Sequence, residues 1–554
     1  MYSGIDTLWV LLGAALVFFM QAGFAMVETG FTRAKNAGNI IMKNLMDFSI
    51  GSCAFFLIGF GLMFGDGNGF IGTIDLFISD TYDFGTLPTW AFVIFQTVFC
   101  ATAATIVSGA MAERTKFSSY IIYSLLIALV VYPVSGHWIW GGGWLSELGF
   151  HDFAGSTCVH MVGGVAALVG AKFLGARIGK YDKDGKAKAI PGHSLTLGAL
   201  GVFILWFAWF GFNGCSTVSM TGDDNIIAAA TIFMTTNIST AAATVVVMII
   251  TWVRYGKPDV SMTLNGSLAG LVAITAGCDA VTPMGAMFIG IIAGFVVVFG
   301  IEFIEKVCKI DDPVGAIGVH GMCGAVGTIL VGVFATDGGL IYGGGFAYLG
   351  IQTLGVVSVA AYVAIVMTII FAAIKYTVGL RVTPEEEIAG LDKFEHGIES
   401  AYADFASFDS AAVAVASDSA VAEKAVPTEA KADGAEKITK VTVVTKETSW
   451  PILKSALETL DITGMTITKV MGCGMQRGGN TFYRGAKVDS VLLPKIKVEI
   501  VICKVPTEKL IETINTALHS GNIGDGKIFV EEMADVVKIS TGEAGYYALQ
   551  DEVM

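Results

Sequence analysis

The sequence predicts a polytopic α-helical membrane protein with eleven transmembrane helices, joined to a small soluble α+β domain at its C-terminal end. Composition is the first reason. Of the 554 residues, 54% are hydrophobic and only 15% are charged, and the mean hydropathy is +0.68. These values are typical of a membrane protein over most of the length. The formal net charge of −14 argues against nucleic acid as a partner.

Long apolar runs are the second reason. A helix of about 20 apolar residues crosses the hydrocarbon core of a bilayer. Eleven such runs occur before the chain becomes charged. They cover residues 7–31, 39–64, 90–112, 118–134, 154–176, 194–212, 226–253, 260–280, 283–306, 316–334 and 346–375.

The distribution of Lys and Arg predicts how these helices are oriented. The first, third, fifth, seventh and ninth connections contain basic residues, as does the segment after the last run, whereas the even-numbered connections contain none. Basic residues concentrate in cytoplasmic connections. We therefore expect a multi-pass protein of the plasma (inner) membrane, with its N-terminus outside and its C-terminal domain in the cytoplasm.

A short internal repeat links the fifth and tenth runs. "VHMVGGVAALVG" from Val159 and "VHGMCGAVGTIL" from Val319 each contain Val-His and a Gly four residues after the His. Five spans per half give the two halves opposite orientations. Inverted repeats are a transporter architecture, with the substrate path at the repeat interface. The sequence therefore predicts two inverted five-helix repeats.

The character of the chain changes twice after the last apolar run. Residues 376–402 are charged and should form a cytoplasmic segment of the first domain, 1–402. Residues 403–436 are rich in Ala, Ser and acidic residues, which is typical of a flexible linker. Residues 437–554 then alternate between strand-like and helix-like stretches in the order β-α-β-β-α-β. That order predicts a ferredoxin-like soluble domain.

Two histidines, His160 and His320, lie inside the fifth and tenth apolar runs. Ionisable side chains in a bilayer cost several kcal/mol and indicate function by default. A single such histidine often only packs or bonds a neighbouring helix, but two at matching places in inverted halves favour a shared site. Because desolvation disfavours the charged form, we expect a neutral pair that offers hydrogen bonds to a small polar solute.

Aromatic residues gather at the predicted outer boundary, among them Phe99, Trp140 and Phe212. Most aromatic residues at such a depth form an interfacial belt. Alternatively, Phe99 and Trp140 face a cation and Ser216 supplies an oxygen, since each ring contributes about 0.5–2 kcal/mol of cation–π attraction. The outer connections lack Lys and Arg, so this face would attract cations.

Five segments, "DFAGSTCVHMVGG", "WGGGWL", "FQTVFC", "FGFNGCS" and "DDPVGAIGVHGMCG", together resemble signature segments of the ammonium transporter family. The resemblance covers about residues 1–402. It implies an outer ammonium site at Phe99, Trp140 and Ser216, which Asp152 supports from inside the fold. It also implies a stacked gate of Phe99 and Phe212, a homotrimer with one pore per subunit, and no metal in the transporter domain.

The same resemblance implies that His160 and His320 are the pore pair, that Trp209 lines the pore, and that Asp311 and Asp312 are an inner acidic pair. An intact ammonium ion cannot cheaply cross a hydrocarbon-lined constriction. We therefore expect ammonium, and possibly methylammonium, to lose its proton near the gate and to cross as the neutral amine. The proton either stays outside or follows a separate relay.

The C-terminal stretches "GCGMQRGGNTFYRGAKVDSVLLPKIKVEI" and "GNIGDGKIFVEEMADVVKISTGEAG" resemble PII signal-transduction proteins over about residues 438–548. A Gly-Asp-Gly-Lys turn before a strand offers backbone donors and a lysine to phosphates. The resemblance implies ATP or ADP binding through Gly524, Gly526, Lys527 and Lys538.

The PII resemblance also implies 2-oxoglutarate binding around Gln476 and Lys495, with Mg held through ATP at Gln476. Residues 474–492 would form an effector loop with Arg484 near its tip. This chain departs from many PII proteins at four positions. Met475, just before Gln476, replaces a polar residue that is often seen there. Val488 replaces a modifiable tyrosine, and Lys538 and Ser540 replace two arginines that contact phosphates. We therefore expect no uridylylation and an altered nucleotide preference.

These features predict an ammonium transporter that its own PII domain regulates. The alternative is an ammonium sensor, in which the pore binds ammonium, conducts little and signals through the PII domain. The fused domain could also act on a separate PII protein, or serve only as a structural nucleotide-binding module. The sequence contains no nucleophile–base arrangement or Walker motif, so an enzyme is not expected.

Overall fold

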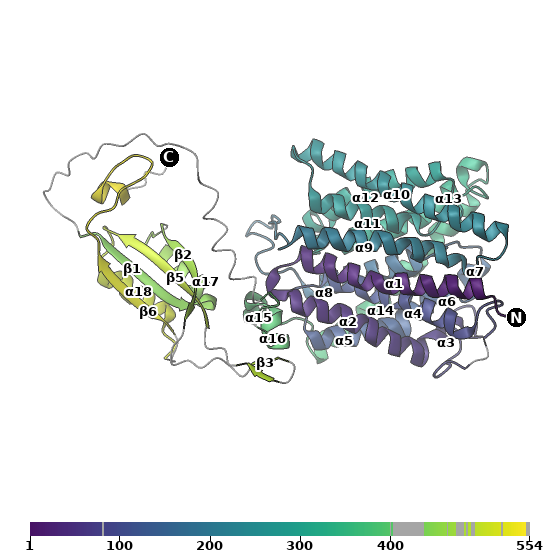
Figure 1. Cartoon of the computed structure of the whole chain (residues 1–554), viewed down its shortest axis with the longest axis horizontal. Helices are drawn as coiled ribbons and strands as arrows, with labels where there is room; N and C mark the ends of the chain where they lie inside the picture. Colours follow the sequence, from purple (N-terminus) through teal and green to yellow (C-terminus); the bar gives the residue numbers. More distant parts are fainter. Residues whose placement is uncertain are drawn as a thin grey trace. The chain divides into compact units, whose positions relative to one another are not determined.

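The computed structural model describes residues 1–79, 82–398, 400–402, 437–462, 464–472, 481–483, 486–488, 493–521 and 525–549, with backbone only for those between 481 and 494. The predicted linker, 403–436, lies outside the described residues. The chain divides into two compact units, residues 1–401 and 402–554 (Figure 1).

The first unit is a bundle of helices. Four short π-helical segments, each continuous with an α-helix, cover Phe55–Gly59, Ile127–Val131, Ser156–Met161 and Ile317–Met322. The α-helices are α1 (Gly4–Phe31), α2 (Ala37–Ala54), α3 (Phe60–Phe64), α4 (Thr89–Ala110), α5 (Phe117–Leu126), α6 (Tyr132–Ile139), α7 (Trp144–Glu147), α8 (Val162–Leu174), α9 (Leu195–Gly214), α10 (Asp223–Tyr255), α11 (Val260–Ile274), α12 (Pro283–Lys306), α13 (Cys323–Phe334), α14 (Ala347–Thr377), α15 (Pro384–Ala389) and α16 (Leu391–His396).

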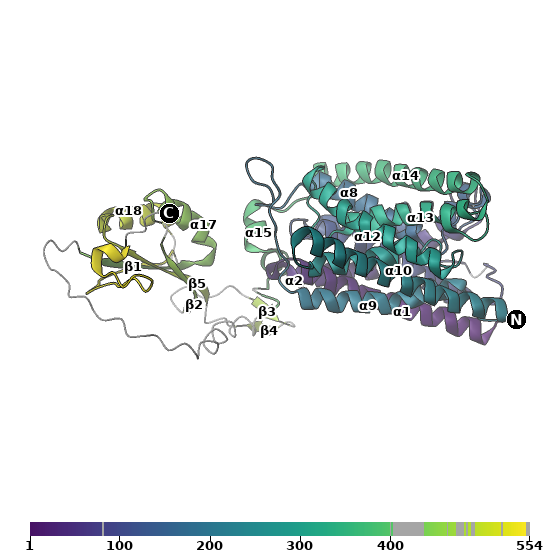
Figure 2. The same cartoon turned by 90° about the horizontal axis from the view of Figure 1, so that it is seen from above.

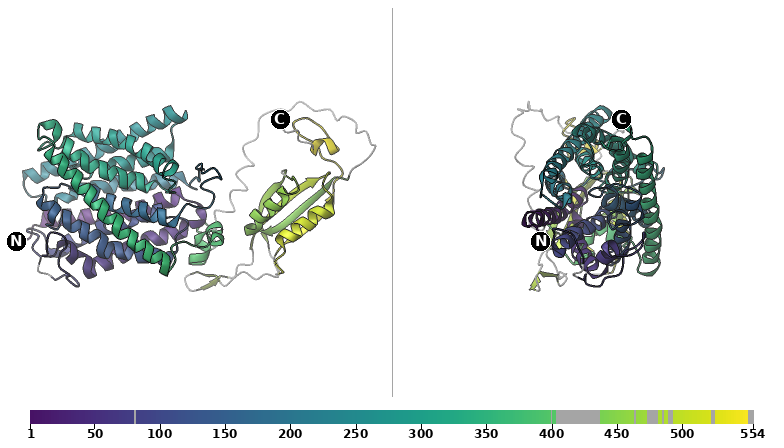
Figure 3. Two further views of the ribbon diagram at one scale, coloured as in Figure 1. Left: turned by 180° about the vertical axis from the view of Figure 1, so that it is seen from behind. Right: turned by 90° about the vertical axis from the view of Figure 1, so that its right-hand side faces the viewer.

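Within the described chain, ten helical segments are long and apolar enough to cross a membrane. The predicted run 260–280 differs: its helix, α11, has only 15 residues, and turns occupy the next six positions. The count of eleven spans therefore depends on α11. Seen from behind, α14 runs obliquely across the other helices, and the end-on view looks along their axes (Figure 3).

Small residues let these helices approach closely. Helices α1 and α9 pack along their length, and a Cβ atom added to Gly30 would lie 2.4 Å from the backbone nitrogen of Gly198. Close backbone approach through small residues is the usual basis of helix packing in membranes. Three threonines of α4 bond within their own helix, because the hydroxyls of Thr97, Thr102 and Thr105 donate to carbonyls four residues earlier.

The second unit is built around a four-stranded antiparallel sheet with the strand order β2-β5-β1-β6. Helices α17 and α18 lie on the same side of this sheet, and Val443, Val498 and Leu453 are among the residues of their common core (Figure 2). This order is that of the predicted ferredoxin-like fold. The elements are β1 (Thr439–Lys446), α17 (Trp450–Glu458), β2 (Thr466–Gly472), β3 (Thr481–Tyr483), β4 (Ala486–Val488), β5 (Leu493–Ile502), α18 (Thr507–Leu518) and β6 (Lys527–Glu532).

Candidate functional site

Asp152 holds the start of the π-helical turn Ser156–Met161, which carries His160. Its carboxylate is buried, so it needs hydrogen-bond donors. It accepts hydrogen bonds of 2.8–3.1 Å from the backbone N–H groups of Gly155, Thr157 and Cys158. Gly155 has φ = +110°, a conformation that favours glycine. Asp152 thus orients the backbone that presents the first histidine, whereas its support of an ammonium site stays a prediction.

Asp312 does the same for the second π-helical turn, Ile317–Met322, which carries His320. Its carboxylate accepts hydrogen bonds of 2.7–3.3 Å from the backbone N–H groups of Val314, Gly315 and Ile317. Both turns follow the pattern Asp-x2-Gly-x4-His. This pattern is a stronger repeat signal than the Val-His match, and it identifies Asp312 as the counterpart of Asp152.

Burial raises the pKa of Asp152 and of Asp312 above the ordinary aspartate value, and the backbone N–H groups oppose that rise. The donors favour the ionised carboxylate. At both carboxyl groups, fixed backbone dipoles therefore offset part of the rise in pKa that desolvation causes.

The two π-helical turns lead into helices that touch at a glycine pair. A Cβ atom added to Gly164 would lie 2.1 Å from the backbone nitrogen of Gly321. This contact brings the two imidazoles together: Nδ1 of His160 lies 3.3 Å from Nδ1 of His320, and the ring centroids are 5.3 Å apart. Both histidines are buried. Nε2 of His160 is buried and has no hydrogen-bond partner among the described residues.

A column of aromatic rings leads to this pair. The rings of Phe99 and Phe212 have centroids 4.2 Å apart and planes tilted by 31°, and Trp140 meets Phe99 edge-on at 6.2 Å. Phe212 in turn lies 5.4 Å from His160, and Trp209 lies 4.9 Å from the same imidazole. The structure therefore brings the predicted cation-facing rings, gate and pore residues into one continuous path.

Two polar groups define the Trp140 end of the path. The indole Nε1 of Trp140 donates to the backbone oxygen of Asp152 at 2.7 Å, which fixes the ring. The Ser216 hydroxyl donates to the backbone oxygen of Phe212 at 2.7 Å. A hydroxyl whose hydrogen is used in this way keeps its lone pairs available to accept. Ser216 can therefore offer an oxygen to a cation.

Trp209 has a polar partner that the sequence did not single out. Its Nε1 donates to Oγ1 of Thr275 at 2.9 Å, and both residues are fully buried. The only sequence signal is a threonine at the end of an apolar run.

Within the part of the chain that the structure describes, no group of three His, Cys, Asp or Glu side chains could hold a metal ion.

Asp311, the other member of the predicted acidic pair, belongs to a buried ion-pair network. Arg177 donates to both carboxylate oxygens of Asp311 at 2.8–2.9 Å and to Glu113 at 3.0 Å. Arg33 also pairs with Glu113. Although burial alone would raise the pKa of Asp311 and of Glu113, the arginines hold both below their ordinary values. Asp311 and Asp312 thus have different roles.

We expect R177M to destabilise the protein by about 3–5 kcal/mol, because it leaves Asp311 and Glu113 buried without their main counter-charge. Thermal unfolding in detergent measures this loss. Lys306, whose side chain is 59% exposed, pairs with Glu302 at 3.4 Å and provides the matched control K306M. That control should cost at most about 1 kcal/mol. Equal losses in the two variants would contradict this interpretation.

In the second unit, three lysines gather at one end of the sheet. Lys495 on β5 pairs with Lys446 on β1, and Lys527 on β6 pairs with Val444 on the same strand. Gly526, just before Lys527, has φ = +128°, and an added Cβ would lie 2.3 Å from the Val444 carbonyl oxygen. A glycine is therefore required beside a basic cluster, an arrangement suited to phosphates.

The other predicted ligand residues are placed as follows. Lys538 lies after β6, where its backbone N–H donates to the Glu543 carbonyl at 2.8 Å. Gln476, Arg484 and Gly524 lie outside the described residues, and so does most of the predicted effector loop.

Comparisons with known proteins identify both parts of the chain. The Ammonium Transporter Family matches residues 8–402, and the nitrogen regulatory protein P-II family matches residues 438–543. The ammonium transporter Amt2 of Archaeoglobus fulgidus is 48% identical over 71% of this chain and 87% of its own length. A putative ammonium transporter of Synechocystis, sll1017, is 42% identical over 71% of this chain and 88% of its own length.

Solved structures agree with these matches. A structure described as a sensor Amt protein aligns with a TM-score of 0.68 and 42% identity over 71% of this chain and 98% of that one. Mep2 of Candida albicans aligns with a TM-score of 0.64 and 29% identity over 70% of this chain and 88% of its own. The chain therefore belongs to the ammonium transporter family and carries a P-II domain at its C-terminal end.

Proposed function

We propose that this protein conducts ammonium nitrogen across the membrane through the path between Trp140 and the histidine pair. The observation that carries the proposal is the buried Nε2 of His160 at the end of the aromatic column, which has no hydrogen-bond partner among the residues that the structure describes. Phe99 and Trp140 present ring faces and edges, and Ser216 an oxygen, so a monovalent ammonium ion is bound first.

The next step follows from desolvation. Beyond the rings of Phe99 and Phe212 the path is lined by buried rings and imidazoles, and among these described residues none carries a fixed negative charge for a bare cation. The ion gives up its proton near these rings, and neutral ammonia exchanges hydrogen bonds with His160 and His320. A potassium ion has no proton to lose, so the same barrier excludes it.

The assembly is proposed in the following form. Helix α11 is the eleventh span, the two halves are inverted repeats, and three copies form a homotrimer with one pore each. The N-terminus faces outside the plasma membrane. The transporter domain covers 1–402, the linker 403–436 and the regulatory domain 437–554, which lies in the cytoplasm.

The P-II domain is the proposed regulator. ATP or ADP binds at Gly524, Gly526, Lys527 and Lys538. Mg and 2-oxoglutarate bind around Gln476 and Lys495, and Arg484 lies on the effector loop. The lysine cluster at one end of the sheet supports phosphate binding there. A coil of 34 residues, the length proposed for the linker, would span roughly 30–35 Å and give an effective concentration near ~1 mM, which favours action on its own trimer over a separate PII protein.

Uptake of radiolabelled methylammonium into proteoliposomes tests the transport proposal, with protein-free liposomes as the baseline. We expect saturable uptake that equal potassium does not inhibit, and restored growth of a transporter-deficient host on low ammonium. Uptake at the baseline, together with ammonium binding to the purified protein, would instead favour the sensor. A solved structure with 42% identity to this chain is described as a sensor Amt protein, and this similarity is the reason for testing the sensor alternative.

Removing the P-II domain separates transport by the first domain from its regulation by the second. If the domain blocks the pore, a chain that ends at Tyr402 should transport at least about threefold faster than the full chain under the ligand condition that silences the latter, since tethering near ~1 mM keeps the block occupied. Methylammonium uptake by both chains, each with ATP, with ADP and with ATP plus 2-oxoglutarate, measures this. Identical uptake under all conditions would contradict regulation in cis.

A further inference from the structure

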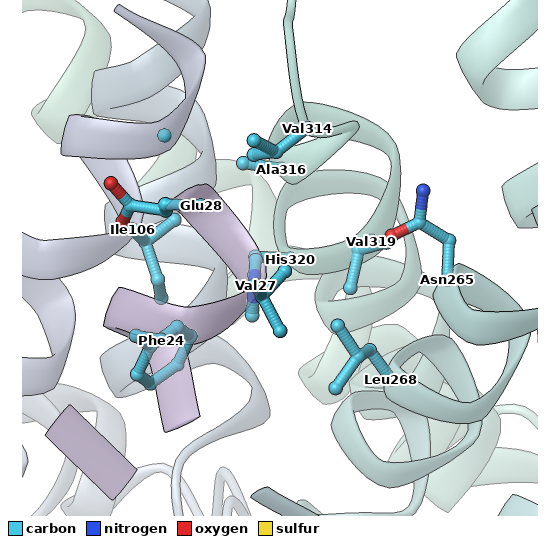
Figure 4. Close-up of a pocket in the computed structure, with 11 residues that line it drawn as sticks. Phe24, Val27, Glu28, Ile106, Asn265, Leu268, Val314, Ala316, Val319 and His320 are labelled. Atoms are coloured by element: carbon cyan, nitrogen blue, oxygen red, sulfur yellow. The ribbon is translucent and has the colours of Figure 1, made fainter. Parts of the chain in front are cut away.

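Glu28 is an acidic residue inside the first membrane helix that the transport path described above does not use. It lies near the end of α1, with a side chain that is almost fully buried. It lines a cavity of about 20 Å³ together with His320 and Asn265. Figure 4 shows Glu28 and Asn265 on opposite sides of this space, with His320 between them. The volume holds one water-sized molecule, and ammonia has that size.

The hydrogen bonds of Glu28 leave half of its carboxyl group available. The Ser108 hydroxyl donates to Oε2 at 2.9 Å, and the Asn44 side chain donates to the same oxygen at 3.3 Å. Among the described residues, none donates a hydrogen bond to Oε1. One oxygen is therefore held in place from α4 and α2, while the other can exchange a hydrogen with a molecule in the cavity.

The charges around Glu28 leave room for one more proton. Lys43 and Asp47 on α2 are fully buried and act on Glu28 through their charge. Nζ of Lys43 and Oδ2 of Asp47 have no hydrogen-bond partner among the described side chains. With the amine charged, two carboxyl groups and one amine are neutral together when one carboxyl holds a proton. The site also contains the uncharged polar side chains of Ser108, Asn44 and Asn265, and His320 lines the cavity.

We propose that Glu28 is the group that returns a proton to ammonia after it has passed His320. The inference rests on the proposed function, because it requires ammonia to reach this cavity. The O–H bond of the Glu28 carboxyl breaks and an N–H bond forms on ammonia, which gives ammonium beside a carboxylate. The ammonium ion leaves toward the inner solution, and the carboxylate takes up a proton from that solution before the next ammonia arrives.

Glu28 fits this role better than its neighbour Asp47. Asp47 is fully buried, accepts a 2.5 Å hydrogen bond from Ser124, and does not line the cavity. Glu28 lines the cavity directly beside the second histidine. Its neighbour Phe24 also contacts that imidazole, with ring centroids 5.9 Å apart. Ammonia leaving His320 therefore meets a carboxyl group before it meets bulk water.

The test compares full-length wild type, E28Q and E28D in proteoliposomes loaded with strong buffers at a series of internal pH values. Radiolabelled methylammonium uptake is measured above the protein-free baseline. Glutamine keeps an acceptor for Ser108 and Asn44 but cannot give up a proton. E385Q, which removes an exposed carboxylate, is the matched control. Size exclusion and thermal unfolding establish that each variant is folded.

For the wild type and E28D, we expect uptake to fall as the internal pH rises, because the carboxyl group must be protonated to donate. E28Q should lose at least about tenfold in maximal rate, equal to ~1.4 kcal/mol, with its half-saturating external concentration within about twofold of wild type. Its residual uptake should not respond to internal pH.

Two results would overturn the inference alone: wild-type rate and pH response in E28Q, or equal losses in E28Q and E28D with the wild-type pH response retained. The second result would mark Glu28 as structural. If wild type itself shows no uptake above the baseline, the proposed function fails instead.

Discussion

H160L should abolish at least 99% of methylammonium uptake while the protein still folds. The imidazole of His160 lies between Phe212, at a centroid distance of 5.4 Å, and His320, whose Nδ1 is 3.3 Å from its own Nδ1. Without it, ammonia loses hydrogen bonds in a dry passage at a cost of ~3 kcal/mol, which corresponds to about a hundredfold in rate. Uptake into proteoliposomes measures the loss.

M161L is the matched control for H160L. Met161 follows His160 on the same π-helical turn and is buried, and a Met-to-Leu exchange conserves volume. We expect M161L to transport within about threefold of wild type, since such exchanges usually cost less than ~1.5 kcal/mol. A folded H160L protein with uptake like that of M161L would refute the role assigned to the imidazole.

D152A should remove transport and also lower stability. The change leaves three buried N–H groups without the acceptor that now binds them at 2.8–3.1 Å. Each unsatisfied group costs ~1–3 kcal/mol, so the π-helical turn and His160 with it should lose their fixed position. We expect uptake to fall by about a hundredfold or more, with a loss of ~3 kcal/mol or more in thermal unfolding.

Two further variants serve as the equivalent change and the control for D152A. D312A removes the equivalent acceptor before His320 and should give a loss of similar size, because Asp312 also accepts three backbone N–H groups. D184A removes an exposed carboxylate between α8 and α9 and should leave stability unchanged within about 0.5 kcal/mol. A harmless D152A would mean that Asp152 does not organise the turn.

Side-chain chemistry explains what the sequence could predict. His160 and His320 were recognisable because ionisable groups are costly in apolar runs, and the aromatic residues because their motifs are distinctive. The π-helical geometry of Ser156–Met161 was not predictable from composition, since it depends on where Asp152 and its backbone donors meet in the folded chain. Spacing alone, Asp-x2-Gly-x4-His, would have revealed the second acceptor.

Other features depend on contacts that no local pattern encodes. Glu28 is separated from Ser108 by 80 residues, and only the packing of α1 against α4 joins them. The role of Arg177 likewise depends on two carboxylates from distant connections. In the second unit, the order of strand-like and helix-like stretches along the chain was enough to predict the fold. Its buried strand residues lie on β1 and β5, whereas β2 and β6 are largely exposed.

The Nδ1-to-Nδ1 contact between the two imidazoles gives the histidine pair a direction that one relayed proton can reverse. A hydrogen bond of this kind contains a single hydrogen, so when one ring donates, its own Nε2 becomes an acceptor and the Nε2 of the other ring carries the remaining hydrogen. The pair therefore always accepts at one end and donates at the other. Passing a proton along the pair inverts both ends, and the original direction returns only when the rings exchange tautomers again. The two imidazoles must therefore return to their original tautomers after each proton that they relay in the same direction.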